Sequence, residues 1–184
     1  MALTPSNMVS LGSSAPSFSL LEPLTKKQVS FSDVRGEHGT VVMFICNHCP
    51  YVKHVQQELV RLASEYQEKG VGFVAINSND VKNYPDDSPE KMVEDAKRLG
   101  YPFPYVFDET QEVAKAYGAT CTPDFFVYDE DDELVYRGQL DDSRPNKGSA
   151  DGKDVRTALD NLLSGAPPIK HQRPSVGCNI KWKQ

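Results

Sequence analysis

The chain contains 184 residues, a length typical of one domain, and its 39% hydrophobic and 25% charged residues are typical of a globular protein. Its 20 basic and 26 acidic side chains give a net charge of −6, which argues against a nucleic-acid-binding surface. No apolar run approaches the roughly 20 residues that span a bilayer, and the N-terminus lacks the features of a signal peptide. The sequence therefore predicts a cytoplasmic protein, unless a leader was removed.

The first half of the chain predicts a βαβ unit behind an N-terminal extension. A continuous apolar run indicates a buried strand, and apolar residues at helical spacing follow it until a glycine favours the end of the helix. A second buried strand comes next. The predicted elements are a loose arm over 1–15, strands over 17–21 and 28–31 that form an added hairpin, a strand over 40–45, a helix from about 47 to 70, and a strand over 71–77.

The second half predicts shorter helices and strands followed by a tail. Ser88-Pro89-Glu90 combines a capping serine, a proline and an acid, the residues favoured at a helix start. The elements are a helix over 88–99, a strand over 104–107, a helix over 110–117, strands over 125–128 and 134–138, a polar loop over 141–153, a helix over 155–165, and a tail over 166–184. This order predicts a single α/β domain over 1–184, with a central mixed sheet flanked by helices.

Two of the four cysteines form a C-x-x-C motif where the first βαβ strand meets its helix. The motif is Cys46-Asn47-His48-Cys49, and the other two cysteines are Cys121 and Cys178. Four cysteines in a chain of this length are too sparse for a disulfide scaffold. Next to a βαβ pattern, C-x-x-C indicates a redox pair, whereas without that pattern it would read as half of a zinc site.

Four segments carry a resemblance to a known family. They are Phe44-Ile45-Cys46-Asn47-His48-Cys49-Pro50-Tyr51-Val52, Asp108-Glu109-Thr110-Gln111, Ala119-Thr120-Cys121-Thr122-Pro123 and Gly177-Cys178-Asn179-Ile180-Lys181-Trp182. With them the chain resembles thioredoxin-fold redoxins, in particular the peroxiredoxin-like branch of the thioredoxin/AhpC-TSA superfamily. The resemblance implies a thioredoxin-like fold with an N-terminal β-hairpin and a C-terminal tail. It also implies a thiol–disulfide oxidoreductase that requires no cofactor.

The motif predicts exchange through a mixed disulfide. The reactive species is the thiolate, and unpaired N–H groups at a helix N-terminus favour it. We therefore expect Cys46 to be the nucleophile, with a lowered pKa, and Cys49 to be the more buried resolving thiol. Asn47 and His48 would tune the reduction potential of the cysteine pair. By resemblance to bacterial disulfide oxidases, His48 stabilises the thiolate and makes the couple more oxidising than thioredoxin; the alternative is an exposed, neutral His48 without effect.

Three further residues are candidates for the same site. By resemblance, Thr122-Pro123 is a cis-proline loop whose backbone pairs with an extended substrate; the alternative is an ordinary trans proline. Cys121 either approaches the active site or is a small buried apolar residue. Cys178 comes near Cys46 as a third redox partner if the tail docks as a strand or a cover, and otherwise it is a structural or solvent-facing thiol.

The sequence also departs from its relatives, which leaves two alternative functions open. Thioredoxins have a buried acid in the strand that here spans 40–45, and this strand has none. Peroxiredoxins have Pro and Thr where this chain has Gly39 and Met43, so a thiol peroxidase with an antioxidant role is the second choice. The third is a copper- or zinc-binding protein. Its ligands would come from Cys46, Cys49, Cys178 and either His171 or His48.

The expected partners follow from the exchange chemistry. They are a disulfide-containing protein or small-molecule substrate and a dithiol reductant. We expect no nucleic acid and no membrane among them.

Overall fold

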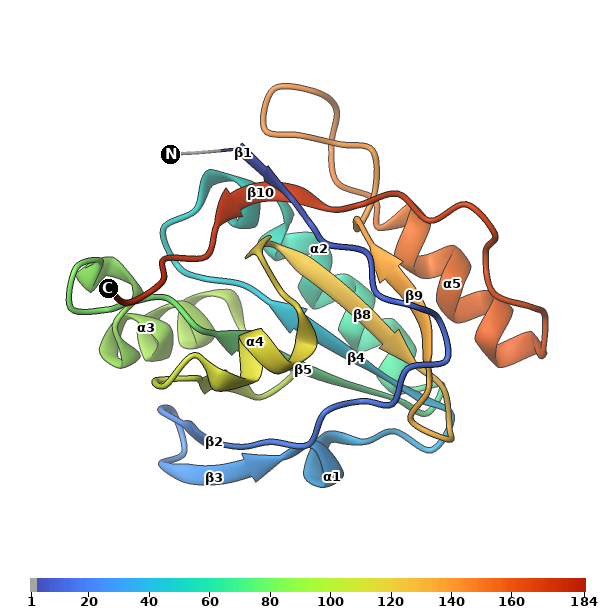
Figure 1. Ribbon diagram of the computed structural model, residues 1–184, viewed down its shortest axis with the longest axis horizontal. Coiled ribbons are helices and arrows are strands. Elements are labelled where there is room, and N and C mark those ends of the chain that lie inside the picture. Colours follow the sequence, from blue (N-terminus) through green and yellow to red (C-terminus); the bar gives the residue numbers. More distant parts are fainter. Residues whose placement is uncertain (1–2) are drawn as a thin grey trace.

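The computed structural model describes residues 3–184, and the strands in this range form two sheets (Figure 1). The larger sheet has the strand order β3-β2-β6-β5-β4-β8-β9. These strands are β2 (Ser19–Glu22), β3 (Lys27–Ser30), β4 (Gly39–Phe44), β5 (Val71–Asn77), β6 (Tyr105–Phe107), β8 (Asp124–Tyr128) and β9 (Leu134–Gly138). β4 pairs in parallel with β5 and antiparallel with β8, so the sheet is mixed, as the sequence predicts.

Helices cover both faces of this sheet, and β4 shows why. Val41 and Met43 belong to one hydrophobic core, whereas Val42 and Phe44 belong to the other. All residues of β4 are buried, which explains its continuous apolar run. The first core includes residues of α2 (Pro50–Gln67), α3 (Pro89–Leu99) and α5 (Lys153–Ser164), and the second includes residues of α1 (Phe31–Val34) and α4 (Glu112–Tyr117). The predicted α/β fold with a mixed sheet flanked by helices is confirmed.

The second sheet joins the two ends of the described chain to a short inner strand. Its order is β1 (Leu3–Pro5), β10 (Val176–Asn179) and β7 (Cys121–Thr122), all antiparallel. The prediction of a loose arm over 1–15 is therefore wrong for its described part, because β1 finds a partner in β10. Residues 1–2 of that arm lie outside the described residues. The 166–184 tail does dock as a strand, one of the outcomes expected for it, while the single-domain assignment stays a prediction.

The ends of α3 follow the capping residues in the sequence. Ser88 caps the helix by accepting a hydrogen bond from the Lys91 N–H, Pro89 occupies the first turn, and Gly100 closes the helix with a φ of 66°. Glycine adopts this left-handed conformation without the steric cost that a Cβ would add. Along residues 3–184, no helix combines the length and the apolar composition needed to cross a bilayer.

Candidate redox site

The C-x-x-C motif lies in the turn between β4 and α2, at the C-terminal end of β4. Cys49 is the N-cap of α2, with φ of −67° and ψ of 125°, and Pro50 is the first helical residue. The helix was predicted to start near Asn47, but it starts three residues later. The Asn47 and His48 N–H groups donate to the Asp87 carboxylate at 2.8 and 3.2 Å instead of facing an open helix end. The positive end of the α2 dipole therefore faces Cys49 rather than Cys46.

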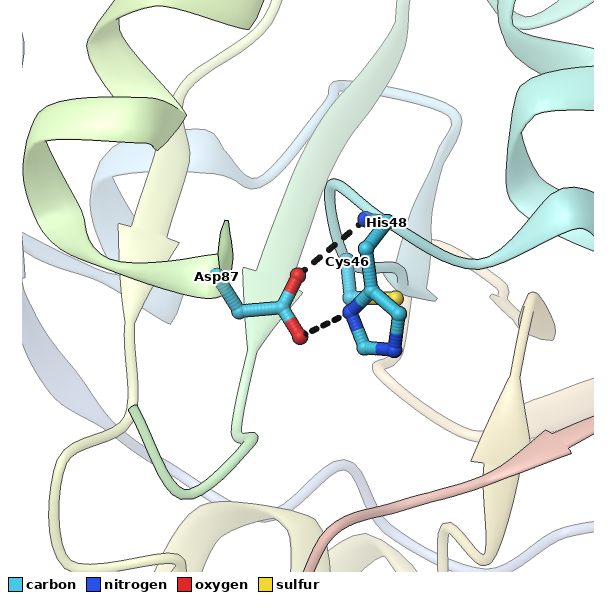
Figure 2. Close-up of side chains that lie close together, drawn as sticks. All are labelled: Cys46, His48 and Asp87. Carbon is cyan, nitrogen blue, oxygen red and sulfur yellow. Dashed lines mark hydrogen bonds and ion pairs between the residues drawn. The ribbon is translucent and has the colours of Figure 1, made fainter. Parts of the chain in front are cut away.

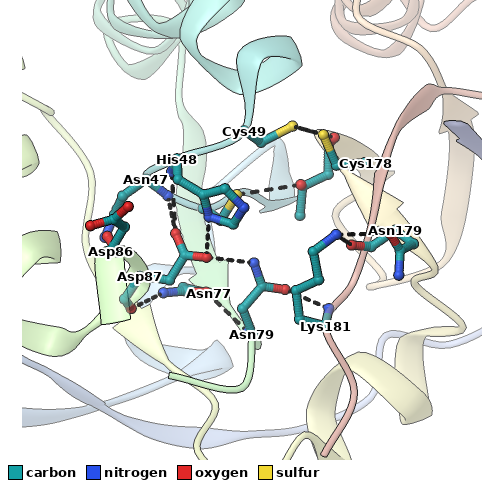
Figure 3. Close-up of polar contacts among 12 residues, drawn as sticks. Asn47, His48, Cys49, Asn77, Asn79, Asp86, Asp87, Cys178, Asn179 and Lys181 are labelled. Carbon is teal, nitrogen blue, oxygen red and sulfur yellow. Dashed lines mark hydrogen bonds and ion pairs between the residues drawn. The ribbon is translucent and has the colours of Figure 1, made fainter. Parts of the chain in front are cut away.

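Three cysteines lie close together at this turn, and Figure 3 labels two of them, Cys49 and Cys178. Cys46 and Cys49 are 1% and 0% exposed, and Cys178 is 3% exposed. The Cys49 and Cys178 sulfur atoms are hydrogen-bonded at 2.6 Å. Cys178 thus contacts the motif through Cys49, whereas the expectation named Cys46, and the solvent-facing alternative is wrong. β10 brings Cys178 against the helix cap, where Cys49 lies.

The two motif cysteines share one hydrogen bond, and it sets the order of their pKa values. The hydrogen bond with Cys46 is the largest cause that lowers the pKa of Cys49, to about 5, and further hydrogen bonds from Cys178 and the Val52 backbone act in the same direction. The same hydrogen bond, burial and the nearby Asp87 raise the pKa of Cys46 well above its ordinary value. The expectation of a lowered pKa at Cys46 is therefore corrected. The reason is that the shared hydrogen bond, the largest cause at both residues, favours the thiolate of Cys49, and the Val52 N–H at the start of α2 acts in the same direction.

A buried carboxylate orients His48 over the pair. Asp87 belongs to the 3₁₀ helix η1 (Pro85–Asp87), is 0% exposed and pairs with His48, with Oδ2 2.5 Å from Nδ1 (Figure 2). Asn79 Nδ2 donates to the same oxygen at 2.8 Å. The hydrogen bond with Asp87 is the main cause that raises the pKa of His48. The alternative of an exposed histidine without effect is wrong, because its side chain is only 18% exposed and ion-paired.

A buried acid thus lies beside the motif, but it belongs to η1 and pairs with His48 instead of lying in β4. Burial alone would raise the pKa of Asp87, yet the hydrogen bonds from His48, Asn79 and Asn47 lower it overall. Sequence reasoning missed this residue. The available signal was slight: two acids, Asp86 and Asp87, stand between two prolines just before a helix cap.

Asn47 fixes the motif loop to its surroundings. Its Nδ2 donates to the Asp86 carbonyl at 3.1 Å, and its Oδ1 accepts from the Tyr105 hydroxyl at 2.8 Å. These contacts connect the loop to η1 and β6. In the structure Asn47 therefore positions the turn, and its side chain has its hydrogen-bond partners away from the sulfur atoms.

The Thr122–Pro123 peptide is cis, as the resemblance implied. The Thr122 hydroxyl lies 3.5 Å from the Cys46 sulfur, and its carbonyl oxygen lies 3.5 Å from the Cys49 sulfur. The expected pairing of its backbone with an extended substrate is corrected in one respect. In this structure Thr122 pairs with Cys178, so β10 of the same chain occupies that edge.

Cys121 is buried in β7. It is 0% exposed, and its sulfur contacts the Pro123 carbonyl at 3.9 Å. Burial is the main cause that raises its pKa. This position matches the small buried residue that was the alternative to a redox role.

Three side chains of the site carry metal-ligand atoms close together. In the described part of the chain, ligand atoms of Cys46, His48 and Asp87 lie within 4.8 Å of one another. Asp87 and His48 already pair with each other, so these atoms form an internal network. His171 is exposed and lies beside Asp142 and Arg173, outside this group.

Comparison with protein families identifies the family to which the chain belongs. Residues 10–159 match the family described as redoxin. The chain belongs to the redoxin family. This redoxin is 30% identical over 131 residues to the thiol-disulfide oxidoreductase ResA of Geobacillus thermodenitrificans, covering 71% of this chain and 70% of ResA. It is 28% identical over 116 residues to ResA of Halalkalibacterium halodurans, where the match spans 63% of this chain and 61% of the relative.

Solved structures agree with the fold. An uncharacterized conserved protein from Geobacillus kaustophilus is 60% identical, with a TM-score of 0.97, and the match covers 100% of this chain and 97% of that one. The thioredoxin domain of a thiol-disulfide oxidoreductase from Bacteroides vulgatus is 16% identical with a TM-score of 0.66, covering 85% and 99%. The thioredoxin-like fold predicted from the sequence is confirmed.

Proposed function

We propose that this redoxin is a thiol–disulfide oxidoreductase in which Cys46 and Cys49 exchange with a substrate disulfide. The ResA relatives, which carry the name of this activity, support the proposal. The observation that carries it is a hydrogen-bonded pair of thiols at a helix N-terminus, one of them with a pKa lowered to about 5. At neutral pH such a pair holds a thiolate, the species that attacks disulfides.

In the proposed reaction Cys46 attacks and Cys49 resolves. Cys49 lies between Cys178 and Thr122 in the first turn of α2, whereas Cys46 lies beside the His48 ring (Figure 2). The hydrogen bond between the motif thiols lets their shared proton move to Cys49, which leaves the charge on Cys46. Attack then forms a mixed disulfide with one substrate sulfur, and the other leaves as a thiolate that takes the proton from Cys49. The Cys49 thiolate attacks Cys46, forms the Cys46–Cys49 disulfide and releases the second substrate sulfur as a thiolate, which takes a proton from solvent.

His48 supports this exchange by holding positive charge near the sulfur atoms, and Asp87 acts through His48. The raised pKa of His48 favours its protonated form, and the Asp87 carboxylate fixes the ring that carries it. A protonated imidazole beside a thiolate stabilises the anion. Whether the couple is also more oxidising than thioredoxin stays a prediction.

The partners and the location belong to the same proposal. The substrate would be a disulfide-containing protein or small molecule, and the electrons would come from a dithiol protein or glutathione. The cytoplasmic location rests on the sequence composition and stays a prediction. The peroxidase and metal-binding alternatives have less support: Met43 is a core residue of β4, and two of the three clustered ligand atoms pair with each other.

Reduction of insulin disulfides tests the proposal. We expect Cys46→Ser and Cys49→Ser to lose turnover, while Cys121→Ala, which removes a thiol outside the site, keeps the wild-type rate. Incubation of Cys49→Ser with glutathione disulfide should accumulate a glutathione adduct on Cys46, because the resolving thiol is absent. Equal rates for wild type and Cys46→Ser would contradict the proposed function, and a Cys49→Ser protein without adduct would contradict the assigned order of attack.

A further inference from the structure

The C-terminal strand places a third thiol where the C-x-x-C motif can use it. β10 pairs antiparallel with β7, with Cys178 opposite Thr122, and β1 covers the other edge of β10 with Leu3 opposite Cys178. Strand addition beside the cis-proline is the geometry expected for an extended substrate. Here the added strand belongs to the same chain, and the residue facing the motif is a cysteine.

Gly177 is the residue that permits this close approach. A Cβ at this position would lie 2.0 Å from the Thr122 carbonyl oxygen, so a side chain here would push β10 away from β7. Because the strand can lie this close, the Cys178 sulfur comes within 2.6 Å of the Cys49 sulfur. The covalent S–S length is about 2.05 Å, so a bond requires only a small movement.

Contacts of the residues that follow Cys178 in the chain hold β10 in this register. The Ile180 N–H donates to the Thr120 carbonyl at 3.0 Å, and the Lys181 N–H donates to Asn79 Oδ1 at 2.8 Å. Gln111 Nε2 donates to the Lys181 carbonyl at 2.8 Å. Asn79 also contacts Asp87, so the segment carrying Cys178 is bound to the network that orients His48. Cys178 is therefore positioned from both ends of its strand.

We propose that Cys178 is a third redox cysteine, which takes over the disulfide by attacking Cys49 after Cys46 and Cys49 have been oxidised. This inference rests on the proposed function. The Cys178 sulfur forms a bond to the Cys49 sulfur, the Cys46–Cys49 bond breaks, and the Cys46 sulfur leaves. The proton released by Cys178 passes to Cys46. The step exchanges one disulfide for another, so the number of electrons held by the protein does not change.

The charges at the site favour this order of events. In the reduced protein, burial and then the hydrogen bond and charge of Cys49 raise the pKa of Cys178 to about 12. Formation of the Cys46–Cys49 disulfide removes the Cys49 charge, which is one of the causes that raise the pKa of Cys178. The Lys181 ammonium, which lowers the pKa of Cys178, remains. Cys178 thus becomes easier to ionise at the stage when it has a disulfide to attack.

Disulfide mapping of the full chain tests the inference. Protein oxidised with oxidised dithiothreitol is quenched in acid, alkylated and digested with trypsin. Cys46 and Cys49 then lie together in the peptide 36–53, and Cys178 lies in 171–181. We expect these two peptides to be linked, with an alkylated Cys46. The Cys46→Ser variant should form the same link, Cys178→Ser should lose it, and Cys121→Ala should retain it.

The outcomes separate this inference from the proposed function. A wild-type protein that forms the Cys46–Cys49 disulfide without any link to Cys178 overturns the third-cysteine role and leaves the C-x-x-C mechanism intact. A wild-type protein that forms neither disulfide overturns both. Because the wild-type digest alone gives the answer, the test does not depend on the folding of a variant.

Discussion

The buried carboxylate beside the motif gives the most specific prediction. Replacing Asp87 with Asn keeps the size of the side chain but removes its charge. In the structure Oδ1 accepts from the Asn47 and His48 backbone N–H groups, while Oδ2 faces the His48 ring and the Asn79 amide. An asparagine oxygen can still serve the two backbone donors. Its NH₂ group would then face the Asn79 amide and the protonated His48 ring, which are both donors, so both of those contacts are lost while His48 is protonated.

The size of the effect follows from these contacts. A hydrogen bond to a charged group contributes about 1.5–3 kcal/mol, and two are lost in Asp87→Asn. Removing the cost of burying the carboxylate offsets part of this, because a buried charge without full pairing is unfavourable. We therefore expect a net loss of about 3 kcal/mol in the free energy of unfolding. In a chain of this size that lowers Tm by about 6–12 °C.

Thermal unfolding of Asp87→Asn, with Asp86→Asn as the control, measures this loss. Asp86 is the exposed neighbour, so its substitution makes the same change in net charge without touching the network. The pH dependence has a definite sign. Because the pKa of His48 is raised above 6.5, the stabilisation from its charged form is present below that pH and is lost as the pH rises through the raised value. The difference in Tm between wild type and Asp87→Asn should therefore become smaller as the pH rises through the raised pKa of His48. Equal Tm values for Asp87→Asn and Asp86→Asn would refute the reasoning.

Three other measurements test separate parts of the structure. The ultraviolet absorbance of thiolate should rise with a midpoint near pH 5 and lose this phase in Cys49→Ala, because the pKa of Cys49 is lowered to about 5; a first midpoint near the free-thiol value of about 8.5 would contradict it. Arg137→Met removes the ion-pair partner of the fully buried Asp124, which lies 2.7 Å away. Urea unfolding should therefore show that the free energy of unfolding falls by about 3–5 kcal/mol. A change near zero would mean that the ion pair does not contribute to stability. Gly177→Ala should reduce the yield of the Cys49–Cys178 disulfide, because its methyl group would meet a β7 carbonyl oxygen; an unchanged yield in the peptide map would count against that role of the glycine.

The main sheet could be predicted from the sequence because its strands have strong local signals. β4 and β5 are continuous apolar runs buried on both faces, and each is bounded by glycine or a polar turn. The small sheet could not be predicted in the same way. β1, β7 and β10 have two to four residues each, without a clear apolar alternation, and they form strands because they pair with one another. Pairing between segments so far apart in the sequence leaves no periodic pattern in any one of them.

The parts of the site that the sequence did not reveal also depend on contacts between distant segments. The C-x-x-C motif is local, but Asp87 is 40 residues from Asn47, and Cys178 is 129 residues from Cys49. The contact that Cys178 makes also helps to lower the pKa of Cys49. The position of β10 thus contributes to the lowered pKa of Cys49 and sets the distance of the third sulfur from it. A displacement of β10, as expected for Gly177→Ala, should raise the pKa of Cys49 as it lowers the disulfide yield. Variants in which only one of the two properties changes would show that the strand does not act through this shared contact.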